Sequence, residues 1–399
     1  MKVLMVHNYL RPPSGENTVF EQERQLLESK GHSVLSYTRQ NSEINSMPIV
    51  GRTMIPLRAV WSRIDYEEIH LLAERERPDV AHFHNIFPLV SPSAYHACKS
   101  AGIPVVQTLH HFRIVCPGAL LFREGRVCEE CSGTRFLPGI LHGCYRDSSL
   151  QTAGMAAIVY FHRMIRTWQN CVDLYIALSD FALGTYVRLG FPSSSFYVKT
   201  NFLQEPVEPT YEDLGYGIYI GRIGEEKGIP FLLDALRMCP ELPFKIIGDG
   251  PLKDYLVRKI EEYQLENVEY LGIKSHSQCM EYLLKARFLV LASLWYEGVP
   301  MVLLEAMSAG KPAVVSNIGV MPEMVRDGVN GFVFTPGACN ELAKKMKILN
   351  TDPAQAERMG QKGRTIFEEK YTRDVNYQMI MDAYTRAINL HNGKIKESR

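Results

Sequence analysis

The sequence contains no continuous apolar run of roughly 18 residues, the length that a membrane-spanning helix requires, so no spanning helix is expected. Its 44 basic side chains balance its 44 acidic ones, which gives no electrostatic reason to expect nucleic acid as a partner. Internal repeats and low-complexity tracts are also missing, which excludes a solenoid or a linker protein. What remains is a chain of 399 residues with 46% hydrophobic side chains, enough for two or three globular domains.

The first residues, Met1–His7, are too short and too soon interrupted for a signal peptide, and they predict a first strand instead. Nine cysteines is an odd number, and without an export signal a reducing compartment is the default. We therefore expect a cytoplasmic protein whose clustered thiols bind metal rather than form disulfides.

The amino-terminal part predicts a βαβ unit: a strand from Lys2, a helix over about Thr18–Ser29 and a second strand from Ser33. A turn-forming loop that contains Gly15 follows the first strand, at the edge where open α/β sheets bind ligands. Gly15 would let a ligand approach the backbone closely, and Asn17 could bind that ligand or cap the helix. Ordinary loop chemistry is the alternative.

Two later predicted strands end in polar residues at the same kind of sheet edge. The first runs into His84 and Asn85, and the second runs into His110. His82 and His84 alternate on one strand face and could share a metal ion. No carboxylate or cysteine adjoins them in the sequence, so structural or acceptor-contacting roles are favoured. His110 falls where the site residues of such sheets collect.

Four cysteines lie within 29 residues: Cys116, Cys128, Cys131 and Cys144. The Cys-x2-Cys pair can hold one tetrahedral ion from a single turn, and the two outer thiols would complete four ligands. The outer spacings match no standard zinc finger, and buried or redox-sensitive thiols are the alternative. We predict a structural zinc ion that organises an insertion at residues 113–145.

Two segments combine basic and apolar side chains at helical spacing. They are residues 52–63 and the part of a predicted helix, 149–168, that surrounds Arg163. Either segment could face an anionic lipid or a lipid-phosphate acceptor. The alternatives are a partly buried helix for the first segment and a solvated face for the second.

A shift toward proline and acidic residues at 204–211 marks a predicted domain boundary. The second half then begins with a strand that leads into Gly221, Arg222 and Lys227. A forked arginine and a flexible lysine on a glycine-rich loop suit a diphosphate, although a solvated basic turn is the alternative. Gly250 and Ile273 lie in two further strand-to-turn steps of this half.

Glu297 and Glu305 flank the predicted start of a helix, where Pro300 stands at the first turn. Free backbone N–H groups and the helix dipole favour an anion such as a phosphate at that position. Carboxylates would repel the phosphate, so these two more plausibly accept hydrogen bonds from hydroxyl groups. A phosphate and several hydroxyls together describe a sugar nucleotide, and a capped surface helix with two solvated glutamates is the alternative.

The ordered set of motifs resembles the family 4 retaining glycosyltransferases of the GT-B fold, and it spans nearly the whole chain. The matching segments are Pro12–Gly15, His110, Gly221–Arg222, Lys227–Gly228, Ile247–Pro251, Trp295–Glu305 and Asn330–Phe332. The cysteine-rich insertion, followed by Tyr145-Arg146, resembles the subset that acts in surface polysaccharide or glycolipid assembly.

The resemblance implies an α/β protein with two Rossmann-like domains that face each other across a cleft. An acceptor domain would occupy residues 1–203 and a nucleotide-sugar domain residues 204–373. The segment 374–399 would form a helix that returns to the first domain, and a tail.

Carried onto this sequence, the resemblance assigns Arg222 and Lys227 to the diphosphate leaving group, Glu297 to sugar hydroxyls and Glu305 to the ribose. His110 would lie beside the reacting sugar. Further donor contacts would come from Gly15, Gly221, Gly250, Ile273 and the backbone of Met301, Val302 and Leu303. Asn17, His84, Asn85 and Arg163 are candidates for the acceptor side. The family often has paired glycines in the first loop, whereas here Glu16 follows Gly15. A carboxylate there is unfavourable beside a diphosphate unless it turns away.

The implied reaction moves a sugar, most simply a hexose, from a UDP- or GDP-sugar to a hydroxyl of a glycan or polyprenyl-linked acceptor, with retention. No catalytic cofactor is expected, because the cations are side chains and the sequence has no Asp-x-Asp pair to hold a metal–diphosphate. Peripheral contact with the inner face of the cell membrane is part of this expectation. A sugar-nucleotide 2-epimerase of the same fold and a non-catalytic zinc-bearing assembly protein are the alternatives, and the complete cation and carboxylate set argues against both.

Overall fold

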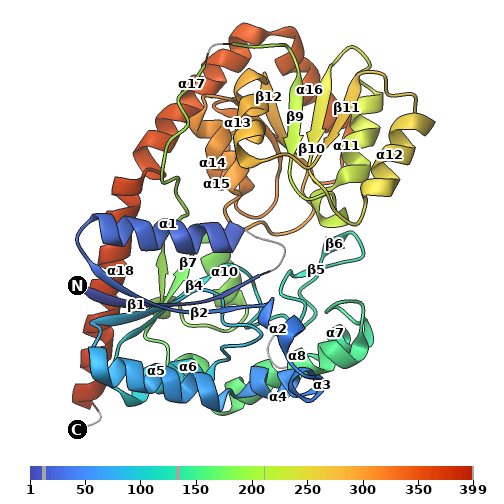
Figure 1. Cartoon of the computed structure of the whole chain (residues 1–399). Helices are drawn as coiled ribbons and strands as arrows, with labels where there is room; N and C mark the ends of the chain where they lie inside the picture. Colours follow the sequence, from blue (N-terminus) through green and yellow to red (C-terminus); the bar gives the residue numbers. More distant parts are fainter. Residues whose placement is uncertain (11–14, 132–134, 211, 398–399) are drawn as a thin grey trace. The chain divides into compact units, whose positions relative to one another are not determined.

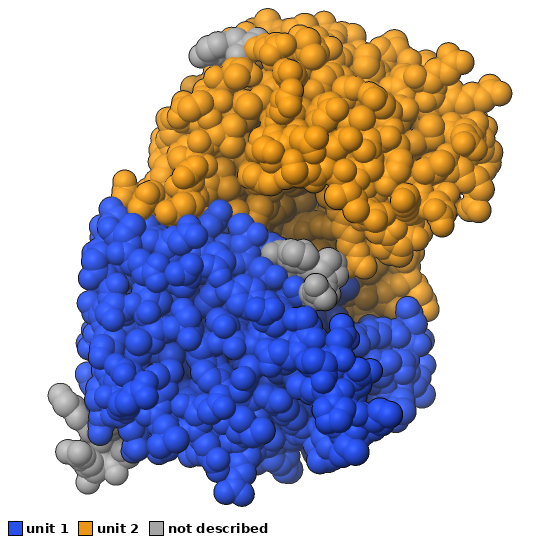
Figure 2. Space-filling view, viewed as in Figure 1, with its two compact units in different colours: residues 1–120, 129–201, 376–399 blue, residues 121–128, 202–375 orange. Residues whose placement is uncertain are grey.

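The computed structural model describes residues 1–10, 15–131, 135–210 and 212–397. The predicted first-loop motif at Pro12–Ser14 lies outside the described residues. The chain divides into two compact units, coloured in Figure 2. Unit 1 comprises residues 1–120, 129–201 and 376–399, and unit 2 comprises residues 121–128 and 202–375. The sequence predicted the divisions after residues 203 and 373. Residues 121–128, expected in the insertion of the first domain, group with unit 2 instead.

Six parallel strands form the sheet of unit 1, in the order β2–β1–β3–β4–β7–β8. They are β1 (Lys2–Tyr9), β2 (Ser33–Gln40), β3 (Val80–Phe83), β4 (Val105–Leu109), β7 (Leu174–Ala177) and β8 (Phe196–Val198). Figure 1 labels four of them, β1, β2, β4 and β7. Every residue of β3, β4 and β7 is buried, as expected for central parallel strands. Since β3 and β4 are neighbours, the loops that follow them lie side by side at the carboxyl edge.

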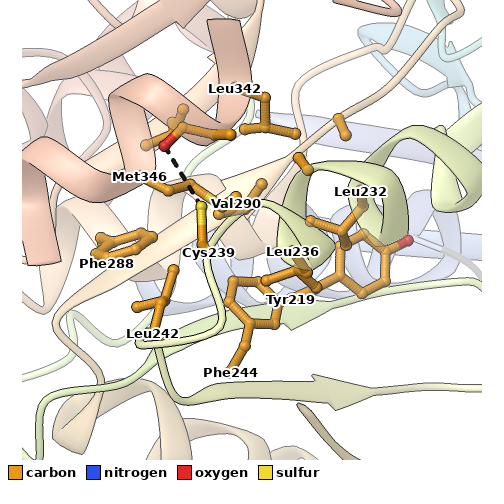
Figure 3. Close-up of a cluster of buried hydrophobic side chains, with 14 of the residues drawn as sticks. Tyr219, Leu232, Leu236, Cys239, Leu242, Phe244, Phe288, Val290, Leu342 and Met346 are labelled. Carbon is orange, nitrogen blue, oxygen red and sulfur yellow. Dashed lines mark hydrogen bonds between the residues drawn. The ribbon is translucent and has the colours of Figure 1, made fainter. Parts of the chain in front are cut away.

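Unit 2 repeats this architecture with six parallel strands in the order β11–β10–β9–β12–β13–β14. They are β9 (Gly217–Ile220), β10 (Phe244–Ile247), β11 (Val268–Gly272), β12 (Phe288–Leu291), β13 (Ala313–Ser316) and β14 (Gly331–Phe334). The hydrophobic core of unit 2 includes residues of the sheet and of a helix that covers it. Phe244 and Phe288 of the sheet pack with Leu232 and Leu236 of that helix (Figure 3). Each such buried side chain contributes about 1.5–3 kcal/mol of hydrophobic stabilisation. The predicted α/β fold of two Rossmann-like units is therefore confirmed.

Helices flank both sheets. In unit 1 they are α1 (Gly15–Ser29), α2 (Glu43–Ser46), α3 (Ile49–Thr53), α4 (Ile55–Val60), α5 (Arg63–Glu76), α6 (Ser93–Ser100), α7 (Leu137–Leu141), α8 (Ser149–Met164), α9 (Thr167–Asn170) and α10 (Asp180–Arg188). In unit 2 they are α11 (Ile229–Arg237), α12 (Lys253–Glu262), α13 (His276–Lys285), α14 (Met301–Ser308), α15 (Met321–Met324), α16 (Cys339–Thr351) and α17 (Pro353–Lys370).

The last helix, α18 (Arg373–Glu397), belongs to unit 1 from Asn376 onward. Ile380, Ala383 and Tyr384 are buried in the same core cluster as Val3 and Met5 of β1. The predicted return of the carboxyl-terminal helix to the first domain is confirmed.

Three local expectations need correction. α1 begins at Gly15 rather than at Thr18, so Gly15 is a helix residue and not part of a turn. The single helix predicted over 149–168 is two helices, because Arg166 adopts a left-handed conformation with φ 56° that interrupts the hydrogen-bond ladder. The insertion also contains a hairpin, β5 (Phe122–Arg123) with β6 (Arg126–Val127), that the sequence did not predict.

Candidate functional site

Glycines at the carboxyl ends of the unit 2 strands let three loops pack backbone against backbone. Gly228 has φ 71°, and a Cβ there would lie 1.9 Å from the carbonyl oxygen of Ala292. A Cβ on Gly250 would lie 2.4 Å from the carbonyl oxygen of Ile223. Gly250, predicted to contact the donor, therefore has a packing reason to be glycine, and a larger side chain would push these loops apart.

Lys227 and Glu297 form an ion pair at this sheet edge, with Nζ 2.6 Å from Oε1. Ser293 donates a hydrogen bond of 2.6 Å to the same oxygen, and the ammonium lies 5.1 Å from the centre of the Trp295 ring. Burial by itself would raise the pKa of Glu297. The charge of Lys227 and the hydrogen bonds from Lys227 and Ser293 outweigh that effect, so the pKa lies below its usual value. Glu297 is therefore an ionised hydrogen-bond acceptor.

Arg222 follows Gly221 on the loop after β9, as the predicted motif requires. Its side chain is 66% exposed, and its Nε lies 3.8 Å from Oε1 of Glu226. Such a long, solvent-screened ion pair contributes little to stability, so the guanidinium can turn to an anionic ligand at small cost.

The amino terminus of α14 lies next to this ion pair in the sequence. Pro300 precedes the helix, and its carbonyl accepts a hydrogen bond of 3.1 Å from the N–H of Leu303. Of the three predicted backbone donors, Leu303 is therefore used within the helix. Met301 and Val302 come before that first intrahelical donor, where helix geometry directs N–H groups outward to a ligand.

Glu305 makes a contact that the sequence analysis missed. Its Oε1 lies 2.8 Å from Nε2 of His276, the first residue of α13. The hydrogen bond to Glu305 is the main cause that raises the pKa of His276 above its ordinary value. The Ser275–Gln278 capping box was the available signal, because it fixes where α13 begins and hence where His276 points. Ile273, predicted to contact the donor, is 73% exposed on the adjoining turn.

In unit 1, the neighbouring loops after β3 and β4 bring two predicted residues together: His84 Nδ1 lies 3.0 Å from His110 Nε2. His110 lines a cavity that also involves Glu16, His111 and Arg113. The side chain of Glu16 is only 8% exposed, and its Oε2 lies 4.0 Å from Nε2 of His111. Glu16 is thus directed into unit 1. His111 and Arg113 were not predicted, although their position just after β4 could have indicated them.

The other candidates for the acceptor side serve mainly local structure. Asn17 bonds to His7 and to the backbone of Leu10, and Asn85 bonds to the backbone of its own loop and of β1. Arg163 is partly buried over the rings of Phe136 and Phe191. Burial lowers the pKa of Arg163.

Three of the four predicted zinc ligands belong to unit 1, and two close glycine contacts link their segments. A Cβ on Gly118 would lie 3.3 Å from Cβ of Cys144, and a Cβ on Gly139 would lie 3.0 Å from Sγ of Cys131. Gly118 is two residues from the third of these cysteines, Cys116. The fourth, Cys128, groups with unit 2.

Two family models match consecutive parts of the chain. One, described as Glycosyltransferase Family 4, matches residues 13–202, and the other, described as Glycosyl transferases group 1, matches residues 203–366. The chain belongs to the family 4 glycosyltransferases of the GT-B fold. The predicted resemblance is confirmed.

Sequence relatives of this GT-B glycosyltransferase include an uncharacterized glycosyltransferase of Methanocaldococcus jannaschii, 31% identical over 160 residues, or 40% of this chain and 45% of the relative. Another is the putative colanic acid biosynthesis glycosyltransferase WcaL of Escherichia coli, 28% identical over 225 residues, or 52% of this chain and 54% of the relative. The chain thus spans about half the length of the curated relatives it matches.

Solved structures extend the likeness over almost the whole chain. Anabaena HepE in complex with UDP is 20% identical with a TM-score of 0.66, covering 96% of this chain and 100% of the other. Sucrose-phosphate synthase from Thermosynechococcus elongatus is 16% identical with a TM-score of 0.70, covering 96% of this chain and 98% of the other. At these identities the likeness shows the shared GT-B fold.

The His276–Glu305 pair predicts a titration. Because the pKa of His276 is raised in the folded protein, its ring is fully charged at pH values below the ordinary histidine pKa, and its charged contact with Glu305 is lost as the pH rises through the raised pKa. In NMR titrations of the His276 ring, Glu305→Gln should lower the midpoint. Glu281→Gln is the matched control, because Glu281 pairs with Lys285 on the same helix. Equal midpoints in wild type and Glu305→Gln would contradict the assignment.

Proposed function

We propose that this protein is a retaining glycosyltransferase that moves a sugar, most simply a hexose, from a nucleoside-diphosphate sugar to a hydroxyl of a glycan or lipid-linked acceptor. The observation that supports this most directly is the charged site of unit 2. Lys227, Arg222 and the first turn of α14 are suited to a diphosphate, and Glu297 and Glu305 are suited to hydroxyl groups. Membership of the family and the parallel-sheet edge at which the site lies agree with that assignment.

The proposed chemistry stabilises the leaving group. As the bond to the sugar breaks, negative charge grows on the diphosphate, and Arg222, Lys227 and the backbone N–H groups of α14 stabilise it without a catalytic metal ion. The acceptor hydroxyl attacks from the face that the diphosphate leaves, which retains the anomeric configuration. The departing phosphate takes the hydroxyl proton, so the proposal assigns no general base.

The donor is proposed to be a UDP-sugar, with a GDP-sugar as the alternative. Solved structures of HepE hold UDP, UDP with glucose, and UDP-glucose, and the present chain shares their fold. The relatives whose names include colanic acid and amylovoran biosynthesis favour a glycan or polyprenyl-linked acceptor. We place the reaction in the cytoplasm, where thiols such as those of the cysteine cluster remain reduced.

We also propose one structural zinc ion held by Cys116, Cys128, Cys131 and Cys144. The tight contacts at Gly118 and Gly139 support it, because they draw together the segments that bear three of the ligands. Cys131 additionally packs in a small buried cluster with Phe136, Ala156 and Val159. Four thiolates fit zinc, and a structural zinc ion can supply about 10 kcal/mol of folding free energy to such an insertion. The ion would order the 113–145 segment and take no part in sugar transfer.

Peripheral membrane contact is proposed for one surface of unit 1. No helix among the described residues is long and apolar enough to cross a bilayer. However, α4 and α7 both pack against α8, and α3 packs against α4 (Figure 1). These four helices carry highly exposed apolar side chains. These are Ile49, Val50, Leu57, Leu137, Leu141, Leu150 and Met164. We call them the apolar surface. Arg63, three residues after the end of α4, is exposed and pairs with Glu67, and an exposed basic side chain near apolar ones favours anionic lipid.

Two basic side chains in the predicted segments, the partly exposed Arg58 and the buried His162, are held by contacts within unit 1. Arg58 bonds to the fully buried carboxylate of Asp65, 3.0 Å away. His162 is buried between Thr167 and the carbonyl of Val60. The part of the first segment around Arg58 is thus the partly buried helix of the alternative interpretation, while Leu57 on the same turn is 62% exposed.

Incubation with a panel of nucleotide sugars, with and without a polyprenyl-linked acceptor, tests the proposed activity. Sugar transfer should appear as release of nucleoside diphosphate that depends on the acceptor. If the reaction needs no catalytic metal ion, this release should persist during a brief treatment with chelator. Formation of a new nucleotide sugar would indicate an epimerase, and no reaction with any donor would favour the assembly protein.

Lys227→Ala and Arg222→Ala should each lower turnover at saturating donor about 100-fold, the roughly 3 kcal/mol that one pre-organised contact to a leaving group supplies. Lys259→Ala is the matched control, because Lys259 forms an exposed pair with Glu262 on α12. Circular dichroism should show that all three variants are folded. Near-native turnover in both site variants would show that the diphosphate lies elsewhere.

Elemental analysis of the purified protein should give about one zinc ion per chain, as a single four-thiolate site requires. Cys128→Ser or Cys131→Ser should release it and weaken acceptor use more than donor binding, whereas Cys339→Ser on α16 should retain it. Zinc-free protein whose free-thiol count does not change under prolonged chelation would refute the site.

The apolar surface predicts sedimentation with phosphatidylglycerol vesicles and weaker sedimentation with phosphatidylcholine vesicles. Leu57→Glu combined with Leu141→Glu should reduce binding at least about tenfold, because two charges replace buried apolar contacts. Leu71→Glu on α5 is the control of similar exposure. If this control loses binding equally, or if no protein sediments, the surface does not bind lipid.

A further inference from the structure

A charged pair is fully buried inside unit 1, beneath the histidines at the sheet edge. Glu23 of α1 and Lys199, which follows β8, have no exposed side-chain surface, and Lys199 Nζ lies 2.7 Å from Oε1 of Glu23. Lys199 also donates to Asn376 Oδ1, 3.2 Å away. Because both side chains are shielded from water, each of their polar atoms needs a partner inside the protein, and the contact with Lys199 uses only one oxygen of Glu23.

The second oxygen faces a histidine. Glu23 Oε2 lies 3.5 Å from His84 Nε2, and within the described residues neither of these buried atoms has a hydrogen-bond partner of normal geometry. If His84 Nε2 carried no proton, two lone pairs would face each other in a site without solvent, which is strongly unfavourable. A proton on Nε2 satisfies both atoms after a shift of a few tenths of an ångström.

The other nitrogen of His84, Nδ1, forms the contact with His110. Burial lowers the pKa of His84 well below its ordinary value, so the ring is neutral and carries a single proton. With that proton on Nε2, the Nδ1 of His84 is an acceptor. His110 Nε2, 3.0 Å away, must then be the donor. Burial lowers the pKa of His110 in the same way, so its single proton lies on Nε2 and its Nδ1 is an acceptor.

We infer that Glu23 is a positioning residue that, through His84, holds His110 in one tautomer, with a proton on Nε2 and an acceptor at Nδ1. That acceptor is suited to a hydroxyl of the sugar undergoing transfer. The role toward the sugar rests on the proposed function, whereas the tautomer itself follows from the geometry of unit 1.

A metal ion is the competing explanation, since Glu23, His82 and His84 present ligand atoms within 4.8 Å of one another. Both ring nitrogens of His82 are already hydrogen-bonded, to the hydroxyls of Tyr384 at 2.9 Å and Thr108 at 2.8 Å. The ammonium of Lys199 also lies where it would repel a cation. The cluster therefore fits a chain of hydrogen bonds with fixed protons better than a metal centre.

The chain of hydrogen bonds predicts an inversion in one variant. The ammonium group of Lys199 can only donate hydrogen bonds. In Glu23→Gln the amide oxygen must therefore accept from Lys199, and the NH₂ group must face His84. His84 then accepts at Nε2 and carries its proton on Nδ1. It donates to Nε2 of His110, whose own proton moves to Nδ1.

Two-bond ¹H–¹⁵N correlation spectra of the full-length protein labelled with ¹⁵N-histidine distinguish these tautomers. Spectra of His84→Gln and His110→Gln assign the two rings. In wild type, both rings should show Nε2–H, and Glu23→Gln should convert both to Nδ1–H. Glu21→Gln is the matched control on α1, because Glu21 bonds to Arg24 and Tyr9. A wild-type ring with Nδ1–H, or unchanged tautomers in folded Glu23→Gln, would overturn the inference, and the wild-type spectrum decides even if the variant fails to fold.

Turnover separates this inference from the proposed function. Glu23→Gln should lower the transfer rate at least about tenfold without changing UDP affinity, as expected when an orienting partner of a histidine is lost. Tautomers as predicted in a protein that transfers no sugar would refute the proposed function alone. Inverted tautomers with an unchanged transfer rate would overturn the role of Glu23 in the reaction.

Discussion

The ion pair between Lys227 and Glu297 is the interaction on which the account of the donor site depends. A carboxylate that is 8% exposed cannot remain charged without a partner, and removing one member of a buried pair typically costs about 3–5 kcal/mol. The same two residues are the ones proposed to contact the donor. Binding a diphosphate therefore requires Lys227 to exchange part of its contact with Glu297 for a phosphate, while Glu297 turns its freed acceptor capacity to sugar hydroxyls. On this account the pair keeps the site stable before the donor binds and sets the charge that the donor must match.

Unit 1 also contains a buried ion pair, but this pair does not face a ligand site. Its buried pair, Glu23 with Lys199, has both side chains fully enclosed, and its charge is directed toward neutral histidines rather than toward a ligand. Each unit thus has an ion pair of low exposure near the carboxyl edge of its parallel sheet. In unit 2 the pair is accessible to an anionic ligand, and in unit 1 it is positioned to fix protons on His84 and His110.

Much of the fold could be predicted from the sequence, because strand, glycine loop and helix recur at short range in both halves. The structural roles of two glycines, Gly228 and Gly250, could not be predicted from the sequence. Gly228 and Gly250 follow strands as ligand-binding glycines do, yet a Cβ at either position would meet another loop's backbone. Helix α5 was missed because only Asp65, Ile69 and Ala73 of its 14 residues are buried, which leaves a weak periodic signal.

For the candidate site, local motifs identified Lys227, Glu297 and Glu305, but not the contact between Lys227 and Glu297 or the partner of Glu305. Spacing arguments reach a few residues along a helix or strand, whereas Glu23 and Lys199 are separated by 176 positions and meet only through the order of the sheet. His276 was missed for the same reason, since it joins Glu305 from a different helix.

Calorimetric titration of UDP into wild type, Lys227→Met and Glu297→Gln tests the central claim most directly. If Lys227 exchanges a carboxylate for a phosphate, Lys227→Met should weaken UDP binding at least about tenfold, or roughly 1.4 kcal/mol. Glu297→Gln should bind UDP at least as tightly as wild type, because the competing carboxylate charge is gone, while its sugar transfer falls. Loss of UDP affinity in Glu297→Gln as large as that in Lys227→Met would contradict the account.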